Sequence, residues 1–192
     1  MEKSKTISGR KTLLKICLAA LFGALTAAGT FISIPVPVSP VPIVLQNLFA
    51  LLSGLILGPF LGGAAVGLYL LAGAIGVPVF AGAVGGIAHF AGPTGGFLFG
   101  YLLAAVVGGL IAGRPRVAKA APLWRIICAA VLGLLAIYVP GVIWLKFSRN
   151  LNWAQALAGG FIPFVIGDAI KAVVAIIAAP RLRRAVADHL EG

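Results

Sequence analysis

Six long apolar segments, separated by short connections, make up most of the chain. A helix needs about 20 mainly apolar residues to cross the hydrocarbon core of a bilayer, and the longer segments reach that length. We therefore predict an all-α membrane protein in which a single domain, residues 1–192, contains six transmembrane helices. Their expected ranges are about 13–32, 43–57, 60–75, 97–112, 123–145 and 161–179.

Two of the connections have unusual compositions. The stretch SIPVPVSPVP (33–42) contains four prolines, which favours an extended loop over a helix. The stretch GVPVFAGAVGGIAHFAGPTGG (76–96) is apolar but rich in glycine, which predicts irregular backbone. Irregular backbone at membrane depth is tolerated only where it is buried in protein or lines a cavity. The connection at 146–155 is polar and is expected to be short.

Three prolines bear on the ends and the straightness of the predicted helices. Pro140 predicts a kink within the fifth helix, because proline removes a backbone donor there. Pro163 fits the first turn of the sixth helix, and Pro180 predicts the end of that helix.

The composition supports a membrane location. Hydrophobic residues make up 61% of the chain and charged residues 10%, whereas about a quarter of a soluble domain is charged. Mean hydropathy is +1.12. We therefore expect a multi-pass protein of the cell membrane. Cys17 and Cys128 both lie in apolar segments, and their spacing predicts neither a disulfide, a metal site nor any other cofactor.

The formal net charge of +11 is concentrated beside the apolar segments. Basic clusters occur at 3–15, 114–125 and 181–184. With six crossings, all three clusters and both termini fall on one side, which the positive-inside rule identifies as cytoplasmic. Such clusters suit the anionic headgroups of membrane lipids. Nucleic acid is not an expected partner, because the sequence offers no basic surface interleaved with aromatic residues.

The clearest candidate chemistry is the pair Asp168 and Lys171 within an apolar run. Asp168 is the only carboxylate between Glu2 and Asp188. A spacing of three places both side chains on one helical face. A charge at the centre of a membrane helix costs roughly 2.5–3.5 kcal/mol, so such residues usually face the interior of a bundle. A structural ion pair would explain the pair; we favour a ligand-binding pair that suits a urea or amide group.

Further polar and aromatic residues are predicted near the same level, on the outer half of the protein. The group comprises Gln46, Tyr138, Phe80, His89 and Thr94. The start of the fourth helix, after GPTGG, would present free N–H groups to a carboxylate. Each residue also has a structural alternative, such as a loop cap, an interfacial aromatic residue or a buried hydrogen-bonding histidine.

Small residues form a stripe along the first predicted helix. Ala20, Ala24 and Ala28 recur at a spacing of four, with Ala19 and Gly23 beside them. Small residues at this spacing allow another helix to approach closely. The pattern leaves open whether that helix belongs to this chain or to a partner.

Several stretches resemble the BioY family, the biotin-specific substrate-binding S-components of energy-coupling factor (ECF) transporters. The resemblance covers nearly the whole chain. It is carried by PVPIVLQNLFALLSGLILGP (40–59), GLYLLAGAIGVPVFAGAVGG (67–86), GPTGGFLFGYLLAA (92–105), IYVPGVIWL (137–145) and PFVIGDAIKA (163–172).

The resemblance implies an S-component fold with one biotin pocket near the outer side and the loop 33–42 as its lid. By position, Asp168 and Lys171 would contact biotin, and Gln46 would contribute. Biotin carries a ureido ring and a carboxylate, which suit an acceptor and a donor. The segment Phe80, Ala81 and Gly82 would lie against the ring of biotin. The chain departs from the family pattern at Val44 and Asn47, where threonine is more usual.

The resemblance also implies partners. S-components dock on a transmembrane coupling protein that carries two cytoplasmic ATPases, and the family's docking surface is the stripe Ala20, Ala24 and Ala28. The sequence itself has no G-x-x-x-x-G-K-[ST] loop to hold ATP phosphates. It also offers no serine-histidine nucleophile motif, so we expect no catalytic residues and no enzyme activity. The alternative is a stand-alone or proton-coupled small-solute facilitator.

Overall fold

The computed structural model describes residues 2–37, 39–118 and 120–191, and most of them are helical. Two short strands, β1 (Ser33–Ile34) and β2 (Ile43–Val44), pair antiparallel, and a 3₁₀ helix, η1, covers Ile87–Ala91. The α-helices of the described residues are α1 (Glu2–Ala28), α2 (Gln46–Leu57), α3 (Pro59–Ala74), α4 (Gly95–Ala112), α5 (Leu123–Ser148), α6 (Trp153–Gly160) and α7 (Val165–Glu191).

Each of the six predicted apolar segments coincides with a helix, but the helices differ in length. Among the described residues, Gly9–Ala28 of α1, α4 and α5 are long and apolar enough to cross a membrane. Helices α6 and α7 pass the same test as a pair, bent by 49° at a short break. Helices α2 and α3 have 12 and 16 residues. At 1.5 Å per residue they extend about 18 and 24 Å, less than the ~30 Å of a hydrocarbon core.

The helices pack closely because glycines remove side chains at their contacts. A Cβ atom on Gly54 of α2 would lie 2.2 Å from the carbonyl oxygen of Ala105 on α4. A Cβ atom on Gly62 of α3 would lie 2.6 Å from the carbonyl oxygen of Ser53 on α2. Any larger residue would therefore push these helices apart.

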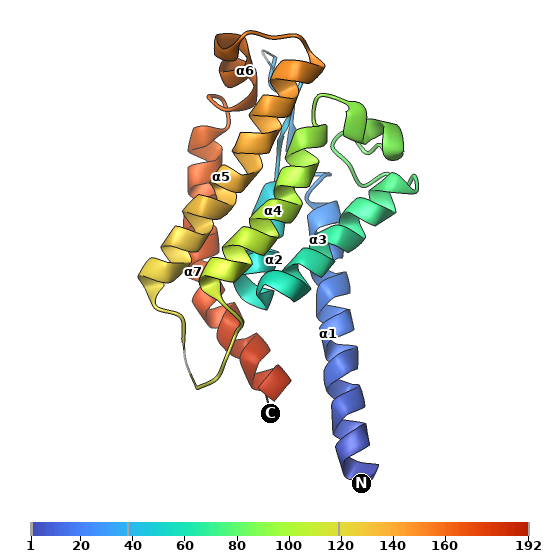
Figure 1. Ribbon diagram of the computed structural model, residues 1–192, viewed down its shortest axis with the longest axis vertical. Helices are drawn as coiled ribbons and strands as arrows, with labels where there is room; N and C mark the ends of the chain where they lie inside the picture. The colour runs from blue at the N-terminus through green and yellow to red at the C-terminus, as the bar shows by residue number, and fades with distance from the viewer. Residues whose placement is uncertain (1, 38, 119, 192) are drawn as a thin grey trace.

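The molecule has two chemically different ends. Both termini and the 113–122 loop lie at one end, shown at the bottom of Figure 1. The β1–β2 hairpin, the 75–94 connection and α6 lie at the other end (Figure 1). The three basic clusters of the sequence therefore lie toward the same end of the molecule (Figure 1), as the sequence predicts.

One buried arginine joins helices at the basic end. The guanidinium of Arg183 donates hydrogen bonds to the carbonyl oxygens of Leu55 at the end of α2, and of Ala112 and Gly113 at the end of α4. Carbonyls in the last turn of a helix have no partner within that helix. A cation there is also favoured by the helix dipole. Arg183 therefore ties the ends of two helices to α7.

Three local predictions are wrong. Pro163 lies before the last helix and not in its first turn, because α7 begins at Val165. The connection expected at 146–155 contains the start of α6, where Asn152 caps the helix and pairs reciprocally with Gln155. Pro180 does not end the last helix, because α7 continues to Glu191. Ala179, Arg183 and Ala187, spaced by four, all remain buried, so packing on this face outweighs the hydrogen bond that proline removes.

Candidate functional site

A cavity of about 30 Å³ lies between α2, α4, α5, α7 and the β1–β2 hairpin, at the end opposite the termini. It offers room for one or two water molecules. Its lining combines apolar and aromatic side chains with a few polar groups. The lining residues are Val41, Pro42, Val44, Asn47, Phe97, Tyr101, Ile137, Tyr138, Phe164, Asp168 and Lys171.

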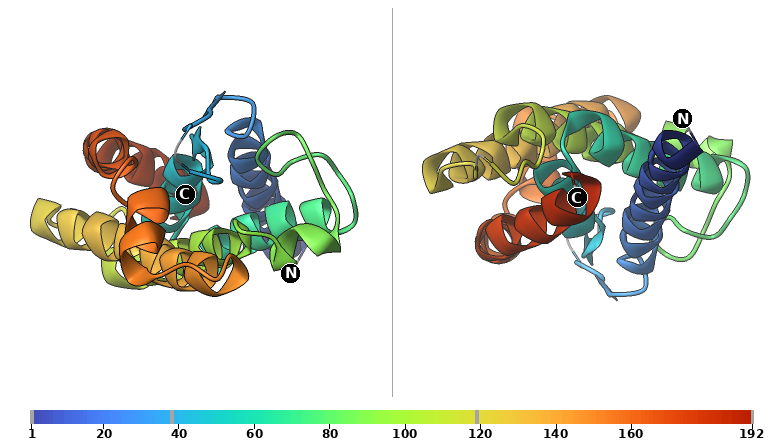
Figure 2. Two further views of the ribbon diagram at one scale, coloured as in Figure 1. Left: turned by 90° about the horizontal axis from the view of Figure 1, so that it is seen from above. Right: turned by 90° about the horizontal axis from the view of Figure 1, so that it is seen from below.

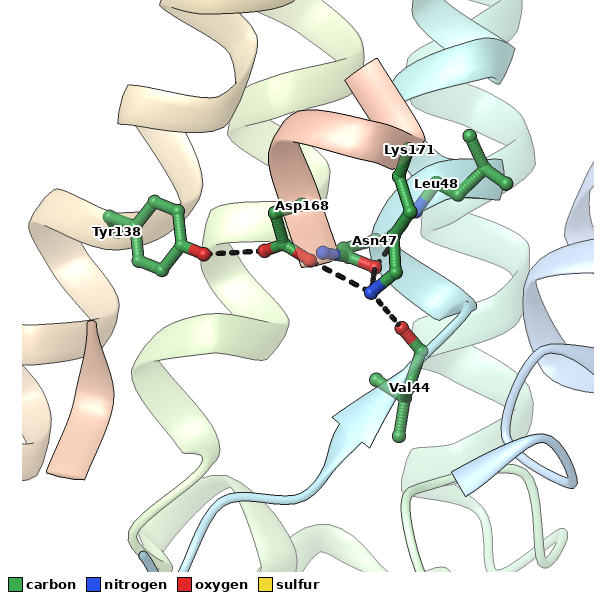
Figure 3. Close-up of polar contacts among 6 residues, drawn as sticks. All are labelled: Val44, Asn47, Leu48, Tyr138, Asp168 and Lys171. Carbon is green, nitrogen blue, oxygen red and sulfur yellow. Dashed lines mark hydrogen bonds and ion pairs between the residues drawn. The ribbon is translucent and has the colours of Figure 1, made fainter. Parts of the chain in front are cut away.

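The predicted pair Asp168 and Lys171 forms an ion pair at this cavity. Lys171 Nζ lies 2.8 Å from Asp168 Oδ1, and the two side chains are 11% and 7% exposed. The ammonium also donates to the carbonyl oxygen of Val44 at 2.7 Å and to Asn47 Oδ1 at 3.1 Å (Figure 3). An ammonium has three donors, and three acceptors are present. The buried cation is therefore fully partnered by groups from α7, β2 and α2.

The second oxygen of Asp168 accepts a hydrogen bond from the hydroxyl of Tyr138 on α5 (Figure 3). The Tyr138 ring packs edge-on against Phe161, with ring centroids 4.9 Å apart. Both carboxylate oxygens thus have donors, one cationic and one neutral. The carboxylate is held in a fixed orientation at the cavity wall.

The hairpin closes the cavity from the end of the molecule opposite the termini (Figure 1). It lies over α2, between α1 and α7 (Figure 2). Ser39 Oγ donates to the carbonyl oxygen of Gly159 at the end of α6, and Val41 N donates to Ser39 Oγ at 3.0 Å. Val41 is buried and Val44 is bonded to Lys171. The hairpin is therefore attached to α6 and to the charged pair at once.

Gln46, predicted as a substrate contact, lies outside the cavity lining. Its side-chain Nε2 donates to the hydroxyl of Tyr69 at 2.8 Å and to the carbonyl oxygen of Val79 at 2.9 Å, and it contacts Thr30 Oγ1. Gln46 is fully buried. This cluster joins the turn after α1 to α2, α3 and the 75–94 connection.

Three predicted residues of the glycine-rich connection, Phe80, His89 and Thr94, contact one another. Phe80 is fully buried, and its ring stacks on His89 with centroids 5.3 Å apart. His89 Nε2 lies 3.3 Å from Thr94 Oγ1, and partial burial lowers the pKa of His89 below its usual value. Ala81 is half-buried and Gly82 is exposed with a φ of +86°. None of these five lines the cavity described above.

Sequence reasoning missed several cavity residues. Asn47, noted only as a departure from a family pattern, accepts a hydrogen bond from Lys171. Tyr101 lines the cavity from α4, where its phenol within FLFGYLL was a polar signal in an apolar run. The carbonyl of Val44 carries no signal in the sequence, because every residue has one.

The small-residue stripe of α1 lies on the side of the helix that points away from the rest of the bundle. Ala20, Ala24 and Ala28 are all exposed. The neighbouring Ala19 and Gly23 are buried, and a Cβ atom on Gly23 would lie 2.9 Å from the carbonyl oxygen of Ala65 on α3. Packing within this chain thus uses the Ala19 and Gly23 face and leaves the alanine stripe uncovered.

Comparisons with known proteins agree in sequence and in structure. A sequence model of the BioY family matches residues 2–188. A protein of Thermotoga maritima named biotin transporter BioY is 44% identical over 166 residues, which cover 86% of this chain and 94% of the relative. A probable biotin transporter BioY of Pyrococcus horikoshii is 41% identical over 169 residues, covering 88% of this chain and 96% of the relative. A crystal structure of the S-component for biotin from an ECF-type ABC transporter matches with a TM-score of 0.82 at 30% identity, covering 90% of this chain and 92% of that one.

Proposed function

Since this chain belongs to the BioY family, we propose that it captures biotin as the membrane-embedded S-component of an ECF-type uptake transporter. The family matches confirm the membership predicted from the sequence. The capture site is the cavity that Asp168, Lys171 and Tyr138 line.

The observation that carries this proposal is the arrangement of acceptor and donors around Asp168. Biotin has a ureido ring, with two N–H donors and one carbonyl acceptor, and a carboxylate at the end of its side chain. The Asp168 carboxylate can accept from a ureido N–H group, and the Lys171 ammonium can donate to a carbonyl or carboxylate oxygen. Charge-assisted hydrogen bonds of this kind are roughly twice as strong as neutral ones.

The apolar walls complete the match. Phe97, Ile137 and Phe164 line the same cavity and suit the hydrocarbon chain and the thioether ring of biotin. Ligand sites are typically apolar with a few placed polar groups, as here. Burial of the ligand's apolar surface then contributes roughly 25 cal/mol per Å².

The hairpin has to move for the ligand to enter. Pockets for ligands of this size typically measure about 300–1,000 Å³. The cavity measures about 30 Å³ with the hairpin in place. Lifting residues 33–44 breaks the Ser39 bond to Gly159 and the Lys171 bond to Val44. The Lys171 donor that is freed can then bond to the ligand, and the Ser39 bond can re-form over it.

The two ends of the molecule define the proposed orientation in the cell membrane. The basic end, with both termini, faces the cytoplasm under the positive-inside rule. The cavity end faces outward, where biotin arrives. In this orientation, helices α1 to α5 and α7 traverse the membrane. Helices α2 and α3 do so despite their shortness because they pack within the bundle, and most residues of α2 are buried.

The expected partners are a transmembrane coupling protein and two cytoplasmic ATPases. The sequence carries no ATP-phosphate loop, so energy for uptake must come from elsewhere. The exposed stripe Ala20, Ala24 and Ala28 is the proposed contact with the coupling protein. Small residues allow the close helix contact that drives association within a membrane.

The test is calorimetric titration of biotin into the purified protein. Asp168→Asn and Lys171→Ala should each weaken binding by at least about tenfold, since a hydrogen bond to a charged group contributes roughly 1.5–3 kcal/mol. Asp188→Asn, on the same helix but at the basic end, is the matched control and should bind as the parent does. If the folded parent does not bind biotin, the proposal that biotin is the substrate is refuted. Undiminished binding by both variants would make the pair purely structural.

A further inference from the structure

A basic hollow lies at the end of the molecule opposite the biotin cavity. It measures about 520 Å³ and lies between the 113–122 loop and α7 around Pro180. Arg116, Arg181 and Arg184 line it and are exposed, and the buried Arg183 lines it as well. No aspartate or glutamate is among the described residues that line the hollow. Its positive potential is therefore not offset locally, and it attracts anions.

Part of this positive charge is fixed in place. Arg183 Nη2 donates to the carbonyl oxygens of Ala112 and Gly113, both at 3.0 Å. Arg125 Nε donates to the carbonyl oxygen of Ile111. A second hollow, of about 290 Å³, is lined by Arg125 and shares Arg116 and Arg183 with the first. The guanidinium groups of Arg125 and Arg183 are thus held in place, which lowers the cost of ordering the site around an anion.

Exposed apolar side chains follow the loop at the start of α5 and occur on both sides of Pro180 in α7. Leu123 and Trp124, which follow the loop at the start of α5, are 58% and 66% exposed. On α7, Ile177 and Leu182 are 66% and 44% exposed, one on each side of Pro180. Tryptophan is enriched where the hydrocarbon core meets water. The hollow therefore lies where a charged headgroup would continue into acyl chains.

We propose that this hollow binds the phosphate of an anionic phospholipid, whose acyl chains lie along the exposed apolar surface of α5 and α7. Arginine recognises phosphate oxygens through paired N–H donors. A free anion would use only the arginines, and an acidic protein segment would leave Leu123, Trp124 and Ile177 uncovered. The lipid uses both the charged and the apolar parts. Bound there, it would connect the loop after α4 to α7, independently of biotin.

Native mass spectrometry of the full-length protein in mild detergent tests the proposal. Dioleoylphosphatidylglycerol and dioleoylphosphatidylcholine are offered at equal concentration, and retained lipid is counted on each protein ion. The parent should retain phosphatidylglycerol at least about tenfold better, and Arg116→Gln/Arg181→Gln/Arg184→Gln should remove most of that preference. The control Arg10→Gln/Lys11→Gln/Lys15→Gln removes equal charge from α1 and should retain it. Trp124→Ala, with every arginine kept, should retain less phosphatidylglycerol.

Each other result overturns the proposal. Equal retention of the two lipids would show that the protein does not prefer the anionic headgroup. Equal losses of phosphatidylglycerol in both triple variants would show that the preference depends on the total charge and not on this hollow. Displacement of phosphatidylglycerol by inorganic phosphate at comparable concentration, with Trp124→Ala unaffected, would make the hollow a simple anion site. Thermal melting of each variant verifies its fold. If the triple variant does not fold, phosphatidylglycerol retention is compared between Arg181→Gln and its control Arg10→Gln.

Discussion

Asp168 is held by two donors of different strength, and each has a different effect on its carboxylate. Lys171 supplies a cation at 2.8 Å, and Tyr138 supplies a neutral hydroxyl. The cation offsets the cost of keeping a carboxylate away from water. The hydroxyl fixes the direction in which the carboxylate points. Loss of the hydroxyl should therefore weaken ligand binding without unfolding the protein.

We predict that Tyr138→Phe lowers the affinity for biotin by about tenfold, since it removes one hydrogen bond to a charged acceptor. Tyr101→Phe is the matched control, because Tyr101 lines the same cavity but makes no described hydrogen bond through its hydroxyl. Calorimetric titration should show the larger loss for Tyr138→Phe. Equal losses in the two variants would mean that the Tyr138 bond to Asp168 does not matter for binding.

At this scale, the sequence indicated two of the residues that line the cavity because each is a charge within an apolar run. Asp168 and Lys171 were found because burying them is costly, and Tyr138 because its level matched theirs. Gln46 and Phe80 are polar or aromatic in the right region but belong to a neighbouring buried cluster. Distinguishing the two groups requires knowing which face of α2 points toward the cavity. The sequence of α2 does not indicate this, because apolar residues occur on nearly every face of the helix.

Among the elements, α3 shows most directly that a close approach between two helices allows only glycine at the contact. Gly62 faces the backbone of α2 with no space for a side chain, whereas nothing lies within 4 Å of a Cβ atom built on Gly67. The two glycines share one helix and one residue type. They differ only in what stands opposite them.

We predict that Gly62→Ala destabilises the folded protein by about 1–3 kcal/mol, the usual cost of overpacking. Gly67→Ala should be neutral or stabilising by up to about 1 kcal/mol, because alanine favours a helix over glycine. Thermal unfolding in detergent, followed by intrinsic fluorescence, compares the two. A fall in melting temperature for Gly67→Ala that matches that of Gly62→Ala would contradict the packing argument.

Helix positions were predicted well because the apolar segments are long, while helix ends were not. Pro180 would end an isolated helix, but buried Ala179 and Ala187 continue the packed face of α7 past it. The capping pair Asn152 and Gln155 marks the start of α6, yet it lay in a stretch that its polarity assigned to a loop. At Pro180, packing of α7 against its neighbours outweighed the tendency of proline to end a helix. At Asn152, the cap started a helix in a stretch whose polarity predicted a loop.

For the whole molecule, the separation of the two ends suits a binding subunit better than a pump. The charged cavity residues cluster at one end, and the basic loops and termini at the other (Figure 1). Asp168 is the only acid between Glu2 and Asp188, and in the closed protein it is paired with Lys171. An acid that is already paired at a closed site does not provide a relay across the membrane.

We predict that sealed proteoliposomes containing this protein alone bind biotin but do not accumulate it. Labelled biotin inside the vesicles should stay at or below one molecule per protein, with or without an imposed pH gradient. Accumulation that follows the gradient and disappears in Asp168→Asn would instead establish the proton-coupled facilitator. Vesicles without protein provide the background.

The closed hairpin also has a kinetic consequence. A cavity of about 30 Å³ is too small to admit biotin with the hairpin in place. Only the fraction of molecules whose hairpin has lifted can bind, so the apparent dissociation constant is the intrinsic one divided by that fraction. Raising the concentration of biotin cannot speed capture without limit. We therefore predict that the association rate levels off at the frequency with which the hairpin lifts and breaks the Ser39 and Lys171 bonds, whatever the supply of the vitamin.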